Sequence, residues 1–231
     1  MSSGYYQLTT GRVAAIDGDC DFPSLNQALS DPDGLIAIGG DLSAARLLSA
    51  YKQGIFPWFN AGDPIMWFSP NPRMVLYPAE LKISISLKKT INSNAFETRI
   101  NTSFAAVITA CSQTPRYNPN GALAGTWITD EMIAAYCELH AQGYAISAES
   151  WQHGKLVGGC YGIKIGRMFY GESMFHLVSD ASKVAFVHLV NYLNNQQVGM
   201  IDCQMKTPLL ASFGGHEIPR EDFINELQAL L

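Results

Sequence analysis

The sequence predicts an α+β protein, with a small N-terminal α/β domain followed by a larger domain built on a mixed sheet. About the first 70 residues are interrupted by turn signals, whereas helices and strands alternate from residue 74 onward. With 231 residues, 48% of them hydrophobic and 15% charged, the chain can bury one large core or two smaller ones. We place the boundary so that residues 1–72 form the first domain and residues 73–231 the second.

The N-terminal domain is expected to contain one short strand and one helix. Residues 31–34, Asp-Pro-Asp-Gly, are a strong turn signal before a strand at residues 35–38. Ser43 is a suitable N-cap for a helix over residues 44–53, in which apolar side chains recur at helical spacing. Gly54 then fits the end of that helix.

Residues 54–73 carry many aromatic side chains interrupted by prolines, including Trp58 and Trp67. Proline fixes φ and removes a backbone donor, so this segment is expected to form neither a regular helix nor a central strand. A loop with so much aromatic surface must pack against the protein or bind a ligand.

The remaining elements follow from hydrophobic periodicity. Residues 81–87 alternate in polarity and predict either a strand or the entry to a helix. Ser179 or Asp180 is expected to cap one of the later helices. The periodicity predicts helices over residues 104–112, 130–142, 181–195 and 221–231, and strands over residues 144–151, 155–165, 168–174 and 200–205.

The composition argues against several classes of protein. A formal charge of −5 does not suit a non-specific nucleic-acid binder, which usually carries a basic surface. No run of about 18 apolar residues suggests a membrane-spanning helix, and the N-terminus lacks the apolar region of a signal peptide. The five cysteines, Cys20 among them, contain no CxxC pair and are expected to be buried thiols in a reducing compartment, which favours a cytoplasmic protein.

A small group of basic residues follows the predicted domain boundary. Lys82, Lys88 and Lys89 lie close together, and Arg73 and Arg99 flank them. By composition alone this group is interpreted as a solvated face.

Two acidic residues in apolar strands are candidates for chemistry. Side chains alternate along a strand, so Asp202 and Gln204 are expected to share one face, with Cys203 on the other. Glu172 lies in the strand predicted at residues 168–174. Each acidic residue is as compatible with a structural pairing as with function, but together they can form a negatively charged pocket for an amine or guanidinium.

Trp127 lies in the segment GTWIT at residues 125–129, before a helix that Thr129 or Asp130 can cap. A single tryptophan in such a place more often packs in the core than contacts a ligand. Trp58, Trp67 and Trp127 nevertheless offer indole faces on which an unpaired base can stack.

Several catalytic motifs are absent from the sequence. It contains neither of the phosphate-binding glycine motifs GxGxxG and GxxxxGK[ST], no HExxH zinc motif and no GxSxG nucleophile motif. The five histidines show no metal-ligand spacing. We therefore expect no metal and no bound cofactor.

A series of motifs runs in order from Phe22 to about Arg220. They read FPSLNQALSDPDGLIAIGGDLSAARLLSAYKQGIFPWF, PIMWFSPNPR, GTWIT, LVGGCYG, FYGESMF, ASK and IDCQ. In this order the chain resembles the leucyl/phenylalanyl-tRNA–protein transferase family. The resemblance implies a C-terminal domain similar to GCN5-related N-acetyltransferases. It also implies transfer of Leu, Phe or Met from aminoacyl-tRNA to acceptor proteins with an N-terminal Lys or Arg, which marks the acceptors for degradation.

The resemblance implies that Asp202, Gln204 and Glu172 are the catalytic residues, which orient the acceptor's amine and receive its proton. A neutral amide is a very weak base, so Gln204 is expected to position the amine, with Asp202 orienting the amide. The α-amine has a pKa of about 8 and is partly neutral at cellular pH. Positioning is therefore expected to supply most of the rate.

The resemblance also implies binding sites for the donor. Trp58 and Trp127 are implied to hold the terminal adenosine. Lys82, Lys88 and Lys89 are implied to contact tRNA phosphates. The implied pocket for the transferred side chain is formed by Cys160, Phe169, Leu189, Leu193 and Ile201, and other family members carry Met at the first of these positions. The protein is expected to act as a monomer.

Two alternatives remain. An acyl-CoA-dependent N-acetyltransferase needs a glycine-containing loop for the pyrophosphate, but residues 175–183 contain no glycine and include Asp180. A non-enzymatic module that binds basic N-termini has use for the acidic residues but none for the aromatic loop or the apolar pocket. Dependence on aminoacyl-tRNA distinguishes the three functions.

Overall fold

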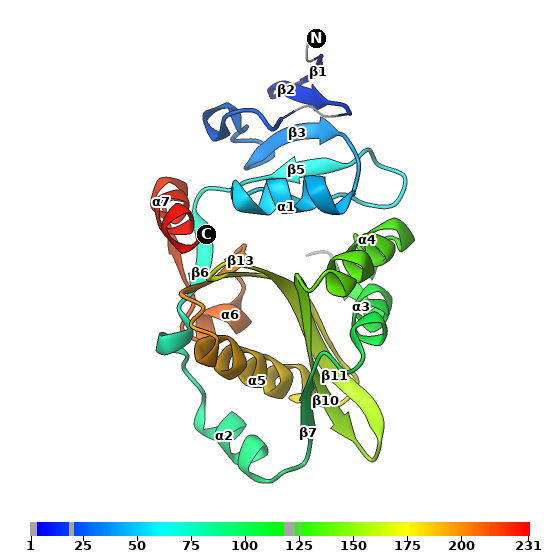
Figure 1. Cartoon of the computed structure of the whole chain (residues 1–231), viewed down its shortest axis with the longest axis vertical. Coiled ribbons are helices and arrows are strands. Elements are labelled where there is room, and N and C mark those ends of the chain that lie inside the picture. Colours follow the sequence, from blue (N-terminus) through cyan, green and yellow to red (C-terminus); the bar gives the residue numbers. More distant parts are fainter. Residues whose placement is uncertain (1–3, 19–20, 118–122, 125) are drawn as a thin grey trace.

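The computed structural model describes residues 4–18, 21–117, 123–124 and 126–231. The predictions that involve Cys20 and Gly125 therefore lie outside the described residues. A five-stranded sheet from the N-terminal part of the chain lies at one end of the molecule, and a seven-stranded sheet fills the middle and the other end (Figure 1). The predicted α+β class with a mixed sheet is confirmed.

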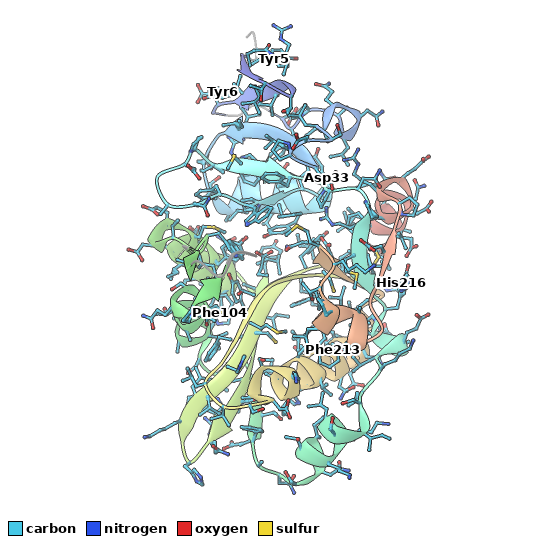
Figure 2. The ribbon with its side chains drawn as sticks, turned by 180° about the vertical axis from the view of Figure 1, so that it is seen from behind. Tyr5, Tyr6, Asp33, Phe104, Phe213 and His216 are labelled. Carbon is cyan, nitrogen blue, oxygen red and sulfur yellow. The ribbon has the colours of Figure 1, made fainter. Side chains whose placement is uncertain are left out.

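The five-stranded sheet has the order β1-β2-β3-β5-β4. Its strands are β1 (Tyr5–Leu8), β2 (Gly11–Ile16), β3 (Leu35–Gly39), β4 (Phe56–Pro57) and β5 (Met66–Phe68). Only β2 and β3 are parallel. The exposed Tyr5 and Tyr6 on the edge strand β1 mark the far end of this sheet (Figure 2).

Helix α1 (Ala44–Lys52) follows β3 and ends where the sequence predicts. The Ser43 side chain accepts a hydrogen bond from the backbone N–H of Arg46, as expected of an N-cap. Gly54 has a φ of +73° and donates its N–H to the carbonyl of Tyr51. A left-handed glycine of this kind commonly ends a helix.

The aromatic segment after α1 contains more regular structure than expected. The prediction that it contains no central strand is wrong, because β5 lies between β3 and β4. Trp67 on β5 is fully buried, and its indole Nε1 donates to the carbonyl of Gly39 at 2.9 Å. This tryptophan is therefore a core residue and no stacking platform.

The seven-stranded sheet has the order β14-β6-β13-β12-β11-β10-β7. It is mixed because β12 and β13 are parallel and the other neighbours antiparallel. Its strands are β6 (Arg73–Leu76), β7 (Glu97–Ile100), β10 (Ala145–Gln152), β11 (Lys155–Ile165), β12 (Met168–His176), β13 (Met200–Gln204) and β14 (His216–Ile218). A short pair, β8 (Arg116–Tyr117) and β9 (Leu123–Ala124), lies apart from both sheets.

Helices cover both faces of this sheet (Figure 1). They are α2 (Ile85–Asn92), α3 (Phe104–Gln113), α4 (Asp130–Ala141), α5 (Ala181–Asn195), α6 (Pro208–Ser212) and α7 (Arg220–Leu230). Helix α5 approaches β11 so closely that a Cβ on Gly158 would lie 2.6 Å from the Cβ of Ala181. A Cβ on the next residue, Gly159, would lie 3.2 Å from Val107 of α3 on the opposite face. Because Gly158 and Gly159 have no side chains, α5 and α3 can pack closely against opposite faces of β11.

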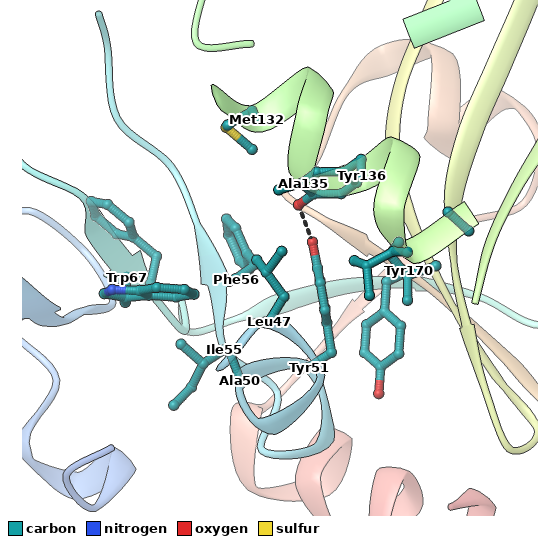
Figure 3. Close-up of a cluster of buried hydrophobic side chains, with 14 of the residues drawn as sticks. Leu47, Ala50, Tyr51, Ile55, Phe56, Trp67, Met132, Ala135, Tyr136 and Tyr170 are labelled. Carbon is teal, nitrogen blue, oxygen red and sulfur yellow. Dashed lines mark hydrogen bonds between the residues drawn. The ribbon is translucent and has the colours of Figure 1, made fainter. Parts of the chain in front are cut away.

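Side chains from α1 and α4 join the two parts of the molecule in one buried hydrophobic cluster (Figure 3). Leu47 and Tyr51 of α1 face Met132, Ala135 and Tyr136 of α4 there. The strands divide between the sheets after Phe68 and before Arg73, but the hydrophobic core does not divide with them. The domain boundary at residues 72 and 73 stays a prediction.

The long amphipathic elements of the second sheet lie within one or two residues of their predicted positions. Residues 81–87 enter helix α2, with Ser84 as N-cap, so the strand alternative is wrong. Strands β1, β2, β7 and β14 and helix α6 were not predicted. Each is short, and each forms against a partner that is distant in sequence or across a tight turn.

Glu149 on β10 is a fully buried carboxylate that holds the start of α3. Its oxygens accept hydrogen bonds from the backbone N–H groups of Thr102 and Ser103 at 2.9 Å, and from the side chains of Thr102, Ser147 and Trp151. Burial alone raises the pKa of a carboxyl, but these donors favour the charged form and lower the pKa of Glu149 below its usual value. This residue has a structural role.

We expect Glu149→Ala to lower the free energy of unfolding by about 3 kcal/mol, because five donors lose the buried carboxylate that accepts from them. Urea denaturation measures the change. The control is Glu138→Ala on the exposed face of α4, for which we expect a change within about 0.5 kcal/mol. Equal effects of the two substitutions would contradict the structural role of Glu149.

Candidate active site

A cavity of about 650 Å³ lies where the N-terminal part of the chain meets the seven-stranded sheet. One wall comes from β4 and the residues after it, including Phe56 and Trp58. The remaining walls come from β11, β12, β13, α5 and α6. Most of the lining is apolar, and the volume is typical of a site for a small molecule or a cofactor-sized group.

Most of the residues predicted to bind the donor line this cavity. Cys160, Phe169, Leu189, Ile201, Trp58 and Trp127 do so. Leu193 does not: it lies one turn beyond Leu189 on α5, fully buried in the core behind the cavity. Helical periodicity places Leu189 and Leu193 on the same face, but the cavity ends before the second of them.

The lining residues that were not predicted include Met174, Phe186 and Cys203. Phe186 lies three residues before Leu189, so helical spacing from a known lining residue could have found it. Cys203 was expected to point away from Gln204, and both residues line the cavity. Burial raises the pKa of the Cys160 and Cys203 thiols well above the usual value. Both are therefore protonated at neutral pH and poor nucleophiles.

Two large apolar side chains remain exposed beside the cavity. Trp58 is 39% exposed and meets Phe68 edge-on at a ring distance of 5.5 Å, and Met205 is 43% exposed. Since both also line the cavity, they belong to the part of its wall that solvent reaches. A planar ring entering from solvent can pack against the indole of Trp58.

Glu172 is the acidic residue in the cavity wall. The hydroxyl oxygens of Tyr51 on α1 and Tyr136 on α4 lie 2.6 and 3.2 Å from its two oxygens, within hydrogen-bonding distance. The two hydroxyls are also within hydrogen-bonding distance of each other (Figure 3). The amide Nε2 of Gln204 lies 3.4 Å from Oε1 of Glu172. This carboxylate therefore connects β12 with both helices and with β13.

Burial raises the pKa of Glu172 to about 7. The hydrogen bonds from Tyr51 and Tyr136 lower the pKa, and the nearby charge of Asp202 raises it. Burial and the charge of Glu172 in turn raise the pKa of both tyrosines well above their usual value. Near neutral pH, Glu172 thus changes between a neutral and a charged group while both tyrosines stay protonated.

Asp202 lies behind the cavity wall and is fully buried. It forms two hydrogen bonds with the guanidinium of Arg73, at 2.8 Å to Nε and 2.7 Å to Nη2. The expectation that Asp202 and Gln204 share a face is wrong, because the strand register shifts between them. Asp202 accepts from the backbone N–H of Gln204 at 2.9 Å, so it fixes the main chain of Gln204 and not its amide group.

The predicted group of basic residues is only partly at the surface. Lys82, Lys88 and Lys89 are exposed, the last two on α2 at the opposite end of the molecule from the five-stranded sheet (Figure 1). Arg73 does not flank them at the surface, because it is fully buried beside Asp202. Arg99 pairs with Glu97 and lies over the ring of Trp151.

Among the described residues, no group of three His, Cys, Asp or Glu side chains is arranged to hold a metal ion. In the same part of the chain, none of the helices combines the length and the apolar character that crossing a bilayer requires.

The arrangement favours direct reaction between two bound molecules. The apolar walls suit a hydrophobic side chain, and Glu172 with Gln204 suits an amine or a cation. The two cavity thiols are protonated, so they offer no ready nucleophile for a covalent intermediate.

Some solved structures are weakly similar to this chain. The structure of L-PGS from Bacillus licheniformis has a TM-score of 0.39 at 10% identity, over 89% of this chain and 70% of that chain. A GCN5-related N-acetyltransferase-like protein from Streptococcus suis has a TM-score of 0.37 at 10% identity, over 76% and 64%.

Sequence comparison gives a closer relation. Residues 40–71 match the leucyl/phenylalanyl-tRNA protein transferase N-terminal domain, and residues 75–228 match the leucyl/phenylalanyl-tRNA protein transferase. The relative of that name from Nitrosospira multiformis is 54% identical over 94% of this chain and 91% of its own length. The one from Chromobacterium violaceum is 55% identical over 90% and 87%. With both parts of the chain matched and more than half of the residues identical, the chain belongs to the leucyl/phenylalanyl-tRNA–protein transferase family and is an aminoacyltransferase.

Proposed function

We propose that this chain transfers Leu, Phe or Met from aminoacyl-tRNA to acceptor proteins that begin with Lys or Arg, and thereby marks them for degradation. The observation that carries the proposal is the meeting of Glu172 and Gln204 at the wall of a largely apolar cavity. This combination suits a reaction between an amine and a hydrophobic acyl group.

The proposed reaction is aminolysis of the ester that joins the amino acid to the tRNA. The lone pair of the acceptor's α-amine attacks the ester carbonyl carbon, and a C–N bond forms. The C–O bond to the terminal ribose then breaks. The ribose oxygen gains the proton that the amine loses, directly or through water, so no further reactant is consumed.

On the donor side, the apolar walls hold the transferred side chain. Cys160, Phe169, Leu189 and Ile201 are proposed to surround it, with Phe186 and Met174 completing the surface. Trp58 and Trp127, on the same cavity, are proposed to hold the terminal adenosine. An unpaired purine packs well against an indole ring.

On the acceptor side, Glu172 is proposed to attract the cationic end of the acceptor. Gln204 is proposed to orient the α-amine by accepting a hydrogen bond at Oε1, since Nε2 is directed to Glu172. Because an amide is a very weak base, Gln204 positions the amine and does not remove its proton. Asp202 is proposed to act through the backbone of Gln204.

Further parts of the proposal concern the tRNA and the cell. Lys82, Lys88 and Lys89 are proposed to contact tRNA phosphates away from the cavity, since all three are exposed and α2 carries no acidic residue. We propose a cytoplasmic monomer, which the four free thiols among the described cysteines support.

The acyl-CoA alternative is disfavoured at the N-terminus of α5. Asp180 occupies the N-cap position there, with its carboxylate 2.8 Å from Lys183. A pyrophosphate at this helix N-terminus would lie next to the negative charge of Asp180.

The transfer reaction is tested with radiolabelled Leu-tRNA and a peptide that begins with Arg. We expect label on the peptide, abolished by RNase treatment of the charged tRNA, and no label on a peptide that begins with Asp. Folded protein that transfers nothing from Leu-, Phe- or Met-tRNA would refute the proposal. Binding of the Arg peptide without transfer would favour a recognition module.

Glu172 predicts a pH dependence. We expect kcat/KM for the Arg peptide to rise with pH through an apparent pKa near 7, as Glu172 becomes charged, and again near 8, as the peptide's amine becomes neutral. In Glu172→Gln the lower transition should disappear and the upper one remain. A lower transition that persists in this variant belongs to another group and would contradict the proposal.

The raised pKa of Glu172 also makes the stability of the protein depend on pH. Folding raises the pKa of Glu172 from its ordinary value near 4.3. Its contribution to stability is therefore complete below about pH 4 and lost as the pH rises through 7. The native protein should lose stability relative to Glu172→Gln over that interval, as thermal denaturation at several pH values will show.

Cys160 predicts a change in donor preference. Cys160→Met adds volume to the cavity wall, so we expect the ratio of kcat/KM for Phe-tRNA to that for Leu-tRNA to fall by about tenfold. The matched control is Cys137→Met on α4, which lies off the cavity and should leave the ratio unchanged. An unchanged ratio in Cys160→Met would place the transferred side chain elsewhere.

A further inference from the structure

The guanidinium of Arg73 is contacted by groups from three other elements, β13, β4 and α7. Its two hydrogen bonds to Asp202 are side by side, and neither partner is more than 1% exposed. The guanidinium carbon lies 4.9 Å from the ring centre of Phe56 on β4 and 4.6 Å from that of Phe223 on α7. A planar cation between two rings, with a bidentate carboxylate at its edge, has one orientation.

Asp202 transmits this orientation to the main chain. Its Oδ1, which accepts from Nε of Arg73, also accepts from the backbone N–H of Gln204 at 2.9 Å. Gln204 has a φ of +63°, in the left-handed region that residues other than glycine rarely adopt. Such a conformation is strained and persists only where the surroundings hold it.

The left-handed conformation decides where the side chain of Gln204 lies. In a regular strand, Asp202 and Gln204 would point to the same side. Here Asp202 is buried behind the wall, whereas Gln204 lines the cavity with its amide beside Glu172. The burial of Asp202 beside Arg73 and the position of the Gln204 amide at the cavity thus both follow from the irregular backbone at the end of β13.

We propose that Arg73 is a positioning residue for aminoacyl transfer. It fixes Asp202, which holds the backbone of Gln204 in the left-handed conformation that directs the amide toward the acceptor's amine. Arg73 itself does not line the cavity, so its effect passes through Asp202 and Gln204. The inference rests on the proposed role of Gln204 in orienting the amine.

The first variant is Arg73→Lys, which keeps the positive charge but loses the paired N–H groups and the planar contact with the rings. We expect kcat for transfer to the Arg peptide to fall between about 10- and 100-fold, the scale of an ångström-sized misplacement. The KM for Leu-tRNA should change less than about twofold, because the donor walls are intact. The control is Arg46→Lys, in the pair with Asp41 near the five-stranded sheet, which should leave kcat unchanged.

A double-mutant cycle distinguishes positioning from general support of the fold. Gln204→Ala alone should lower kcat, and Arg73→Lys should lower it no further in that background, because there is no amide left to position. A merely structural Arg73 would lower kcat by the same factor in both backgrounds, and this result would overturn the inference.

The outcomes separate this inference from the proposed function. If Gln204→Ala lowers kcat while Arg73→Lys does not, only the inference fails. If Gln204→Ala leaves kcat unchanged, the proposed role of Gln204 fails and the inference with it.

Circular dichroism checks whether each variant folds. If Arg73→Lys does not fold, Asp202→Asn replaces it in the cycle, since the substitution hardly changes the volume of the side chain. If neither variant folds, the pair serves the fold and the positioning role is rejected.

Discussion

The buried ion pair between Arg73 and Asp202 is the constraint on which the rest of the structure depends. Removing two charges from water costs several kcal/mol per ion, and the close bidentate geometry of this pair offsets part of that cost. The geometry here requires β6 and β13 to be neighbouring strands. Phe56 of β4 and Phe223 of α7 also pack against the guanidinium, so these two elements must lie beside the pair. If β6 and β13 separate, each charge is left buried without its partner.

The pair also explains how the chain encloses a cavity between two sheets. Arg73 is the first residue of the seven-stranded sheet, directly after the segment that leads out of the five-stranded one. Arg220 secures the same segment from α7, since its guanidinium donates to the carbonyl of Ser69 at 2.6 Å and its backbone N–H to the side chain of Asn71. The wall that β4 contributes to the cavity is therefore held from both sides.

A second polar contact joins the two parts across the cavity. Tyr51 comes from the N-terminal part and Tyr136 and Glu172 from the second, and their hydrogen bonds lie within an apolar cluster. The tyrosines supply donors that partly offset the burial of Glu172, so that its pKa is near neutrality and the group is not permanently neutral.

The sequence by itself determined the α+β class, the long helices and the central hairpin strands, because their signals are local. Periodic apolar residues define α4, β10, β11, β12 and α5 without reference to the rest of the chain. The ordered motifs likewise identified the family. Of the seven residues that they imply for the adenosine and the transferred side chain, six line the cavity. The short strands β7 and β14 were missed, because their hydrogen-bonding partners, β10 and β6, are distant in the chain.

Only the tertiary structure decided whether a residue lines the cavity or lies in the core behind it. Strand alternation placed Asp202 and Gln204 together, but a register shift stabilised by Arg73, 129 residues away in the chain, separated them. Arg73 was assigned to a basic surface for the same reason, since its carboxylate partner is invisible in local sequence. Leu193 has the right spacing and lies beyond the end of the cavity. Pairing between distant residues and the extent of a cavity are properties of the packed chain, and no local pattern encodes them.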